Sequence, residues 1–189
     1  MIFRIIRTAY QIVRFIHKER KREKECYEMP IEDLRELTGD DFLEVLWSRI
    51  LYEEGDMEPE ESLTYFQGAK RTFYIIEYFD MEVQNGGLCQ FFVNSSKEVA
   101  PYLLDSLEEV QAFPYKELLE KFVRDNGILL DDLSSFVIED FDELQDEFAK
   151  QSARYPFEEF DDAYYELYGE EPLGDFLEKY CKEHIGEFA

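Results

Sequence analysis

Amide and carboxylate side chains gather around one Asn-Gly-Gly step in this sequence, within residues 82–96. Such groups can bind a polar ligand, or they can hydrogen-bond one another and hold a turn rigid. The step follows a long amphipathic pattern, and glycine readily ends a helix because it accepts left-handed backbone conformations. We favour the internal network and predict that these residues are structural: Glu82, Asn85, Gly86, Gly87, Gln90 and Asn94.

A second group is carboxylic and lies between residues 139 and 178, where fifteen acids accompany only Lys150 and Arg154. On a helix, side chains three or four positions apart lie ~5–6 Å apart at Cβ, and duplex DNA presents a charge every ~3.4 Å of axis per strand. These rows either imitate a phosphate track or form a solvated acidic face without a partner. The residues predicted to bind a partner are Glu139, Asp142, Glu143, Asp146, Glu147, Glu158, Glu159, Asp161, Asp162 and Glu166.

The charge of the chain is divided unevenly. The formal net charge is −25, but residues 1–25 hold eight Lys and Arg against three Glu, which leaves −30 on residues 26–189. Solubility of a small domain requires a charge magnitude of only about 2–8, and self-repulsion opposes compactness. We therefore expect a basic protein as partner and no direct binding to nucleic acid.

Residues for catalysis or metal binding are scarce. His17 and His184 lie near the two ends of the sequence and match no zinc motif, catalytic triad or general-base pair. Cys26, Cys89 and Cys181 lie far apart and suggest free thiols in a reducing compartment. We expect a non-enzymatic protein with no catalytic, cofactor-binding or metal site.

The N-terminal segment, residues 1–25, is predicted to be a basic amphipathic helix. Its apolar positions recur at helical spacing from Ile2 to Ile16, while Arg4, Arg7 and Arg14 mark the opposite face. Such a helix can lie on an anionic membrane, or it can dock on its own domain or on a second subunit of a homodimer. We favour docking. Neither a signal peptide nor a bilayer-spanning run is expected, so the predicted location is the cytoplasm.

The remaining residues, 26–189, are predicted to form one acidic all-α domain, an irregular bundle of about eight helices. Residues 128–138 are ambiguous between extended pieces and loop. In the central helix the predicted core positions are Leu63, Phe66, Phe73, Ile76, Phe79 and Val83. The predicted helices cover 31–37, 41–54, 59–84, a stretch from Ser96 to Val110, 114–125, 139–153, 157–168 and 172–184.

The 82–96 segment resembles the hallmark motif of the small acidic DNA-mimic family of bacteria (DMP-nineteen type), E-x-x-N-G-G-x-x-Q-F-F-x-N-S. The C-terminal pattern around Phe160 to Tyr168 is also similar, so the resemblance spans roughly residues 60–189. Leu88 departs from it, since the family usually has Phe there. The resemblance implies an all-helical, often dimeric domain whose acidic surface imitates duplex DNA and occupies DNA-binding proteins.

Two functions follow from this pattern of charge. A DNA mimic needs a repeated lattice of carboxylates and competes with DNA for a transcription regulator or nucleoid protein. An immunity protein or inhibitor of a basic toxin needs one complementary patch for one cognate partner. An acidic scaffold without a partner is the remaining alternative. We expect the mimic.

Overall fold

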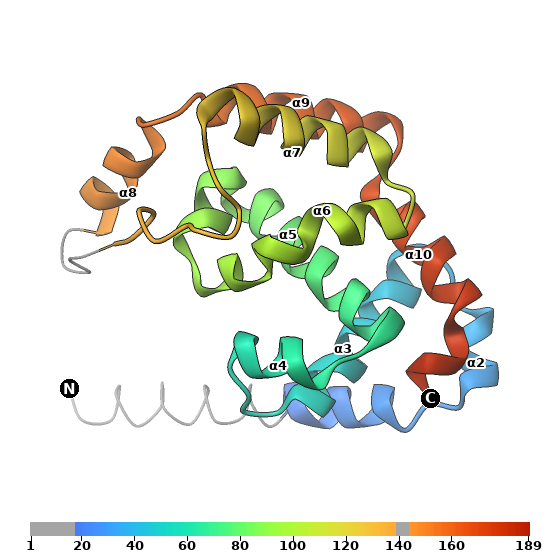
Figure 1. Ribbon diagram of the computed structural model, residues 1–189. Coiled ribbons are helices and arrows are strands. Elements are labelled where there is room, and N and C mark those ends of the chain that lie inside the picture. Colours follow the sequence, from blue (N-terminus) through green and yellow to red (C-terminus); the bar gives the residue numbers. More distant parts are fainter. Residues whose placement is uncertain (1–17, 139–143) are drawn as a thin grey trace, which may run out of the picture.

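The computed structural model describes residues 18–138 and 144–189 (Figure 1). Within these ranges the chain is helical apart from its connections, and the β-type pairing is an isolated bridge between Leu129 and Asp132. The predicted all-α single-domain fold is confirmed. Residues 18–27 are helical, and the helices that follow are α2 (Ile31–Glu36), α3 (Gly39–Glu54), α4 (Pro59–Tyr65), α5 (Gly68–Val93), α6 (Ala100–Glu109), α7 (Phe113–Asn126), α8 (Leu144–Ser152), α9 (Phe157–Glu170) and α10 (Leu173–Glu183), with 3₁₀ helices η1 (Ser95–Val99) and η3 (Ile185–Phe188).

The helix predicted for residues 59–84 is divided in two, so that prediction was wrong. Its start is as expected, with Pro59 in the first turn of α4. Phe66 and Gln67 are then extended, and the chain restarts as α5 at Gly68, whose φ is +55°. The cause is a distant carboxylate: the backbone N–H of Ala69 donates to Glu187 Oε2 at 2.8 Å. Local periodicity cannot predict a cap that comes from the other end of the chain.

The start of α3 is also capped by a carboxylate that is distant in the sequence. The sequence predicts a turn and N-cap at residues 38–40, but the side chain of Thr38 makes no capping hydrogen bond. The N–H of Gly39 donates instead to Glu178 Oε2 of α10 at 2.9 Å. Hydrogen bonds from this N–H and from Lys182 lower the pKa of Glu178 despite its partial burial, which favours the charged form needed at a helix N-terminus.

Other boundaries agree with the predictions. Gly127 is left-handed and ends α7, and Pro101 lies in the first turn of α6. The ambiguous residues 128–138 form a connection with the one isolated bridge. Lys97 helps to fasten this connection by donating to the carbonyl of Phe136 at 2.9 Å.

The core surrounds α5, which runs through the middle of the molecule (Figure 1). Phe79 packs edge-on against Phe91 at 5.3 Å and against Tyr164 of α9 at 5.8 Å between ring centroids. The predicted core positions of this region are all buried: Leu63, Phe66, Phe73, Ile76, Phe79 and Val83.

Arg49 of α3 joins the two ends of the chain. Its buried guanidinium donates to the carbonyls of Cys26, Met29 and Phe188 at 2.8–2.9 Å. Burial lowers the pKa of Arg49, and the carbonyl oxygens at the chain turns stabilise its charge. Breaking such an arrangement would detach residues 26–29 and Phe188 from α3.

The described part of the basic N-terminal segment lies against α3. Arg22 pairs with Glu44, and Arg20 approaches Asp56 at 3.3 Å, both at the exposed surface. The helical stretch 18–27 also crosses the boundary that we placed after residue 25. The Ile-rich positions 2–16 lie outside the described residues. The structure therefore does not test whether their apolar face docks on protein or contacts a membrane.

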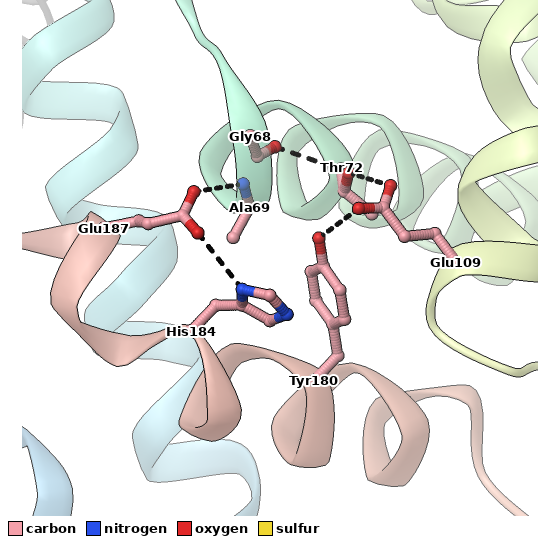
Figure 2. Close-up of polar contacts among 7 residues, drawn as sticks. All are labelled: Gly68, Ala69, Thr72, Glu109, Tyr180, His184 and Glu187. Carbon is pink, nitrogen blue, oxygen red and sulfur yellow. Dashed lines mark hydrogen bonds and ion pairs between the residues drawn. The ribbon is translucent and has the colours of Figure 1, made fainter.

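Figure 2 shows how the C-terminal helices are fastened to the first turn of α5. Tyr180 and Thr72 donate to the two oxygens of Glu109 at 2.6 and 2.7 Å. Nearby, His184 Nδ1 lies 3.1 Å from Glu187 Oε1, while the other oxygen of Glu187 accepts the bond from Ala69. The sequence did not predict this histidine–carboxylate contact. It holds the capping carboxylate in place.

Replacing Glu187 with Ala tests the long-range cap. We expect a loss of about 1 kcal/mol in unfolding free energy, as for other lost helix caps. The bond from Ala69, with a smaller contribution from His184, lowers the pKa of Glu187. Its stabilisation is therefore present above the ordinary carboxylate pKa and disappears as pH falls through the lowered value. Chemical denaturation at several pH values measures this, with Glu183→Ala, an exposed acid four positions earlier, as control. Equal stability of the two variants at neutral pH would contradict the capping role.

Candidate functional site

The carboxylate of Glu82 is the centre of the network predicted at residues 82–96. Its Oε2 accepts hydrogen bonds from Gln90 at 2.7 Å and Asn94 at 2.9 Å, and its Oε1 accepts one from Ser96 at 2.9 Å. These bonds cross the kink in α5 and tie both halves of that helix to η1. Asn85 differs, because its side chain is exposed and makes no hydrogen bond to any described residue.

The Gly86-Gly87 step ends the first half of α5, as predicted, because neither glycine has helical backbone angles. Gly86 has φ −163° and ψ 22°, Gly87 has φ 79° and ψ 176°, and the chain then resumes the helix to Val93. A Cβ on Gly86 would lie 2.0 Å from Gln90 Oε1, and one on Gly87 would lie 2.2 Å from Asp161 Oδ2. At Gly86 the contact is with the end of a flexible side chain that can shift, whereas Gly87 is also required for its positive φ.

Side chains of α9 hydrogen-bond the backbone groups on either side of this kink. The N–H of Leu88 donates to Asp161 Oδ1 at 2.8 Å, so Asp161 caps the second half of α5. Tyr165 donates to the carbonyl of Val83 at 3.1 Å, at the end of the first half. Burial raises the pKa of Asp161, although the bond from Leu88 opposes this. We expected Asp161 in the partner-binding surface. It is half-buried and bonded internally, so we remove it from that surface.

The other predicted partner-binding residues fall into three groups. Glu147 is partly buried and pairs with Lys150 at 2.5 Å. Glu139, Asp142 and Glu143 lie outside the described residues. The acids that the structure places at the surface are Asp146 on α8 and Glu158, Glu159, Asp162 and Glu166 on α9.

The exposed acids of α9 occupy one side of that helix. At 3.6 residues per turn, Glu158, Glu159, Asp162, Glu166 and Glu170 fall within about 120° of its circumference and over ~18 Å of its axis. All five are exposed, and none pairs with a cation of the described residues. We call this set the α9 acidic face.

The neighbouring helix α7 shows that such a face is not inevitable. Its cations neutralise its acids at helical spacing: Lys116 lies 3.7 Å from Glu120, and Lys121 lies 3.5 Å from Asp125. The α9 acidic face instead keeps five charges over ~18 Å, or about one every 4–5 Å. This approaches the density of one DNA strand, a charge every ~3.4 Å.

The three cysteine thiols lie in the interior of the protein. Cys26, Cys89 and Cys181 are buried, and burial raises the pKa of Cys89 to about 12, which disfavours the nucleophilic thiolate. Across residues 18–138 and 144–189, no cluster of three or more His, Cys, Asp or Glu is placed to hold a metal ion. In the same ranges no helix combines the length and apolarity required to cross a bilayer.

Comparison with known protein families gives a match. The family described as DMP19-like protein matches residues 64–184, which include the Glu82 network, the kink and all of α9. This chain belongs to the DMP19-like protein family. The resemblance inferred over residues 60–189 is thereby confirmed at the level of the family. No curated protein and no solved structure matched the chain.

Two further acids of this DMP19-like protein lie partly buried on α5. Burial raises the pKa of Glu77 to about 8, and the nearby charge of Asp80 adds to the effect. Burial also raises the pKa of Asp80, although hydrogen bonds from Tyr164 and from Gln84 oppose this. The hydroxyl of the buried Tyr164 donates a hydrogen bond to Asp80, so this pair also attaches α9 to α5.

Gly87→Ala is expected to destabilise the protein by about 1–3 kcal/mol, because its φ of 79° and ψ of 176° suit glycine alone. Gly86→Ala has no such backbone strain and needs only a shift of the Gln90 side chain, so we expect a smaller loss, about 1 kcal/mol for one weakened hydrogen bond. Thermal and urea unfolding of both variants measure the difference. A Gly87→Ala protein as stable as wild type would show that the kink does not require glycine.

Glu77→Gln should remove a pH-dependent loss of stability. The folded pKa of about 8 exceeds the ordinary glutamate pKa of 4.5, so the neutral acid is tolerated at low pH and stability falls as pH rises through this window. At pH above 8 the variant should exceed wild type by up to roughly 5 kcal/mol, with little difference near pH 4.5. Urea unfolding across pH measures this, and Glu117→Gln on exposed α7 is the control for a simple change of net charge. Parallel pH profiles for wild type and Glu77→Gln would contradict the assignment.

Proposed function

We propose that this DMP19-like protein is a non-enzymatic cytoplasmic protein that binds a basic DNA-binding protein through the α9 acidic face and blocks its binding to DNA. The observation that carries the proposal is the row of exposed carboxylates on α9 without cationic partners among the described residues. Family membership is consistent with it, since the residues matched include this helix.

The physics of such a surface differs from that of isolated ion pairs. An exposed carboxylate contributes only about 0–1 kcal/mol to binding on its own. Closely spaced charges attract condensed cations, which are released when a basic protein binds, so the affinity depends steeply on salt. Long-range attraction between a strongly acidic and a basic protein also speeds their encounter.

Rigidity supports the same proposal. The opposite side of α9 is attached to α5 through Tyr164 to Asp80, Asp161 to Leu88, and Tyr165 to Val83. A face held by these bonds does not have to be ordered when the partner arrives, which reduces the entropic cost of association. The charges therefore keep the spacing that a DNA-binding site recognises.

The test is a charge reversal of four residues, Glu158, Glu159, Asp162 and Glu166, to Lys. Partners are captured on the wild-type protein, purified, and titrated with wild type and variant at several salt concentrations. We expect the reversal to weaken binding roughly a hundredfold or more, since four attractive contacts become repulsive. Duplex DNA should compete with the wild-type protein for the captured partner.

The matched control reverses four exposed acids away from this face, Glu36, Asp105, Asp131 and Glu183, and so changes the net charge by the same amount. Circular dichroism confirms that both variants stay helical. Equal weakening by both sets would show that binding follows net charge and not the α9 acidic face. A partner that binds this protein and DNA together would exclude mimicry, and a partner without DNA-binding activity would favour an inhibitor of a basic toxin.

A further inference from the structure

A hollow of about 260 Å³ lies between α7 and α9, beside the α9 acidic face. The two helices run next to each other along one side of the molecule (Figure 1). Glu159 belongs to both the hollow and the acidic face. The charged row is therefore continuous with a concave site that a partner's side chain can enter.

The floor of the hollow is apolar. Phe122 and Phe160 are buried and meet edge-on, with ring centroids 5.3 Å apart, and Leu118 and Ala163 also line the hollow. A floor of this kind accepts an aliphatic stem, as long cationic side chains pack their methylene groups on apolar surface and keep the charge at the rim.

The polar and charged residues that line the hollow are Glu159, Asp125, Asn126 and Lys121, and we call them its rim. The exposed carboxylate of Glu159 has no cationic partner among the described residues. Asn126 uses its Nδ2 to donate to the carbonyl of Phe122 at 2.8 Å, which leaves its Oδ1 as an acceptor. Asp125 lies at the same rim, 3.5 Å from Lys121 and 3.1 Å from Arg124.

We propose that this hollow binds an arginine side chain of the basic partner, with its stem on Phe122 and Phe160 and its guanidinium between Glu159 and Asn126. The proposal rests on the proposed function and names the side chain that anchors the partner there. Arginine fits better than lysine because its planar guanidinium offers five donors in a fixed fork to acceptors on two helices, and because it packs well on aromatic rings.

Lys121 provides a second test of the proposal, in which removing a charge should strengthen arginine binding. Its ammonium occupies the rim beside Asp125 and repels an incoming cation. Removing this charge should strengthen arginine binding, whereas removing the charge of Glu159 should weaken it. A purely structural hollow would respond to neither change.

The experiment is an NMR titration of backbone amides with two acetylated and amidated pentapeptides, each with one central Arg or Lys flanked by glycines. We expect the arginine peptide to cause saturable shifts in α7 and α9, and to bind more tightly than the lysine peptide. Glu159→Gln should weaken it about fivefold, Lys121→Gln should tighten it about twofold, and Glu166→Gln should change it little. Ala163→Leu fills the hollow without disfavouring the helix and should abolish the shifts.

Shifts that never saturate, equal affinity for the two peptides, or identical effects of Glu159→Gln and Glu166→Gln would overturn the arginine site. That failure is separate from failure of the proposed function. If the four-residue reversal still releases the captured partner, the acidic face stands without the hollow. If the arginine peptide binds as expected but DNA does not compete for any captured partner, the arginine site is supported and DNA mimicry is contradicted.

Discussion

The arrangement of this protein depends on carboxylates from its last third that bind the N-termini of earlier helices. Glu178 receives the N–H of Gly39, Glu187 that of Ala69, and Asp161 that of Leu88. A helix N-terminus has unpaired N–H groups and a partial positive charge, so a carboxylate satisfies both. At each site the chain enters the helix through a glycine with positive φ: Gly39, Gly68 and Gly87.

This constraint changes how the acidity of the chain is understood. Several acids serve the interior: Glu54 accepts bonds from Ser62 and Tyr74, Glu82 holds the kink, and Glu109 joins Thr72 to Tyr180. Net charge alone therefore overstates the charge available to a partner. On α9, five exposed acids lie on one side of the helix and make no ion pair or hydrogen bond with a described residue.

The sequence was sufficient for properties that depend on nearby residues. Helical periodicity located the core positions of α5, and Gly127 and Pro59 marked real helix ends. It was insufficient where a distant group decides the local structure. The break before Gly68 and the kink at Gly87 both depend on carboxylates more than seventy positions away. Asp161 was misassigned for the same reason, since its spacing among the acids of α9 gives no sign of the Leu88 amide.

The bond between Arg49 and the carbonyl of Phe188 has a consequence for how the chain is made. A ribosome delivers the sequence from its N-terminus, and the helices α2 to α5 emerge long before residue 188. Until residues 178–188 leave the exit tunnel, Arg49 lacks one of its three carbonyl acceptors, and the first turns of α3 and α5 lack their capping carboxylates. The fold around α3 and α5 can therefore be completed only after residue 188 has emerged, and a nascent chain that stops before this point exposes apolar helix faces that chaperones or proteases recognise.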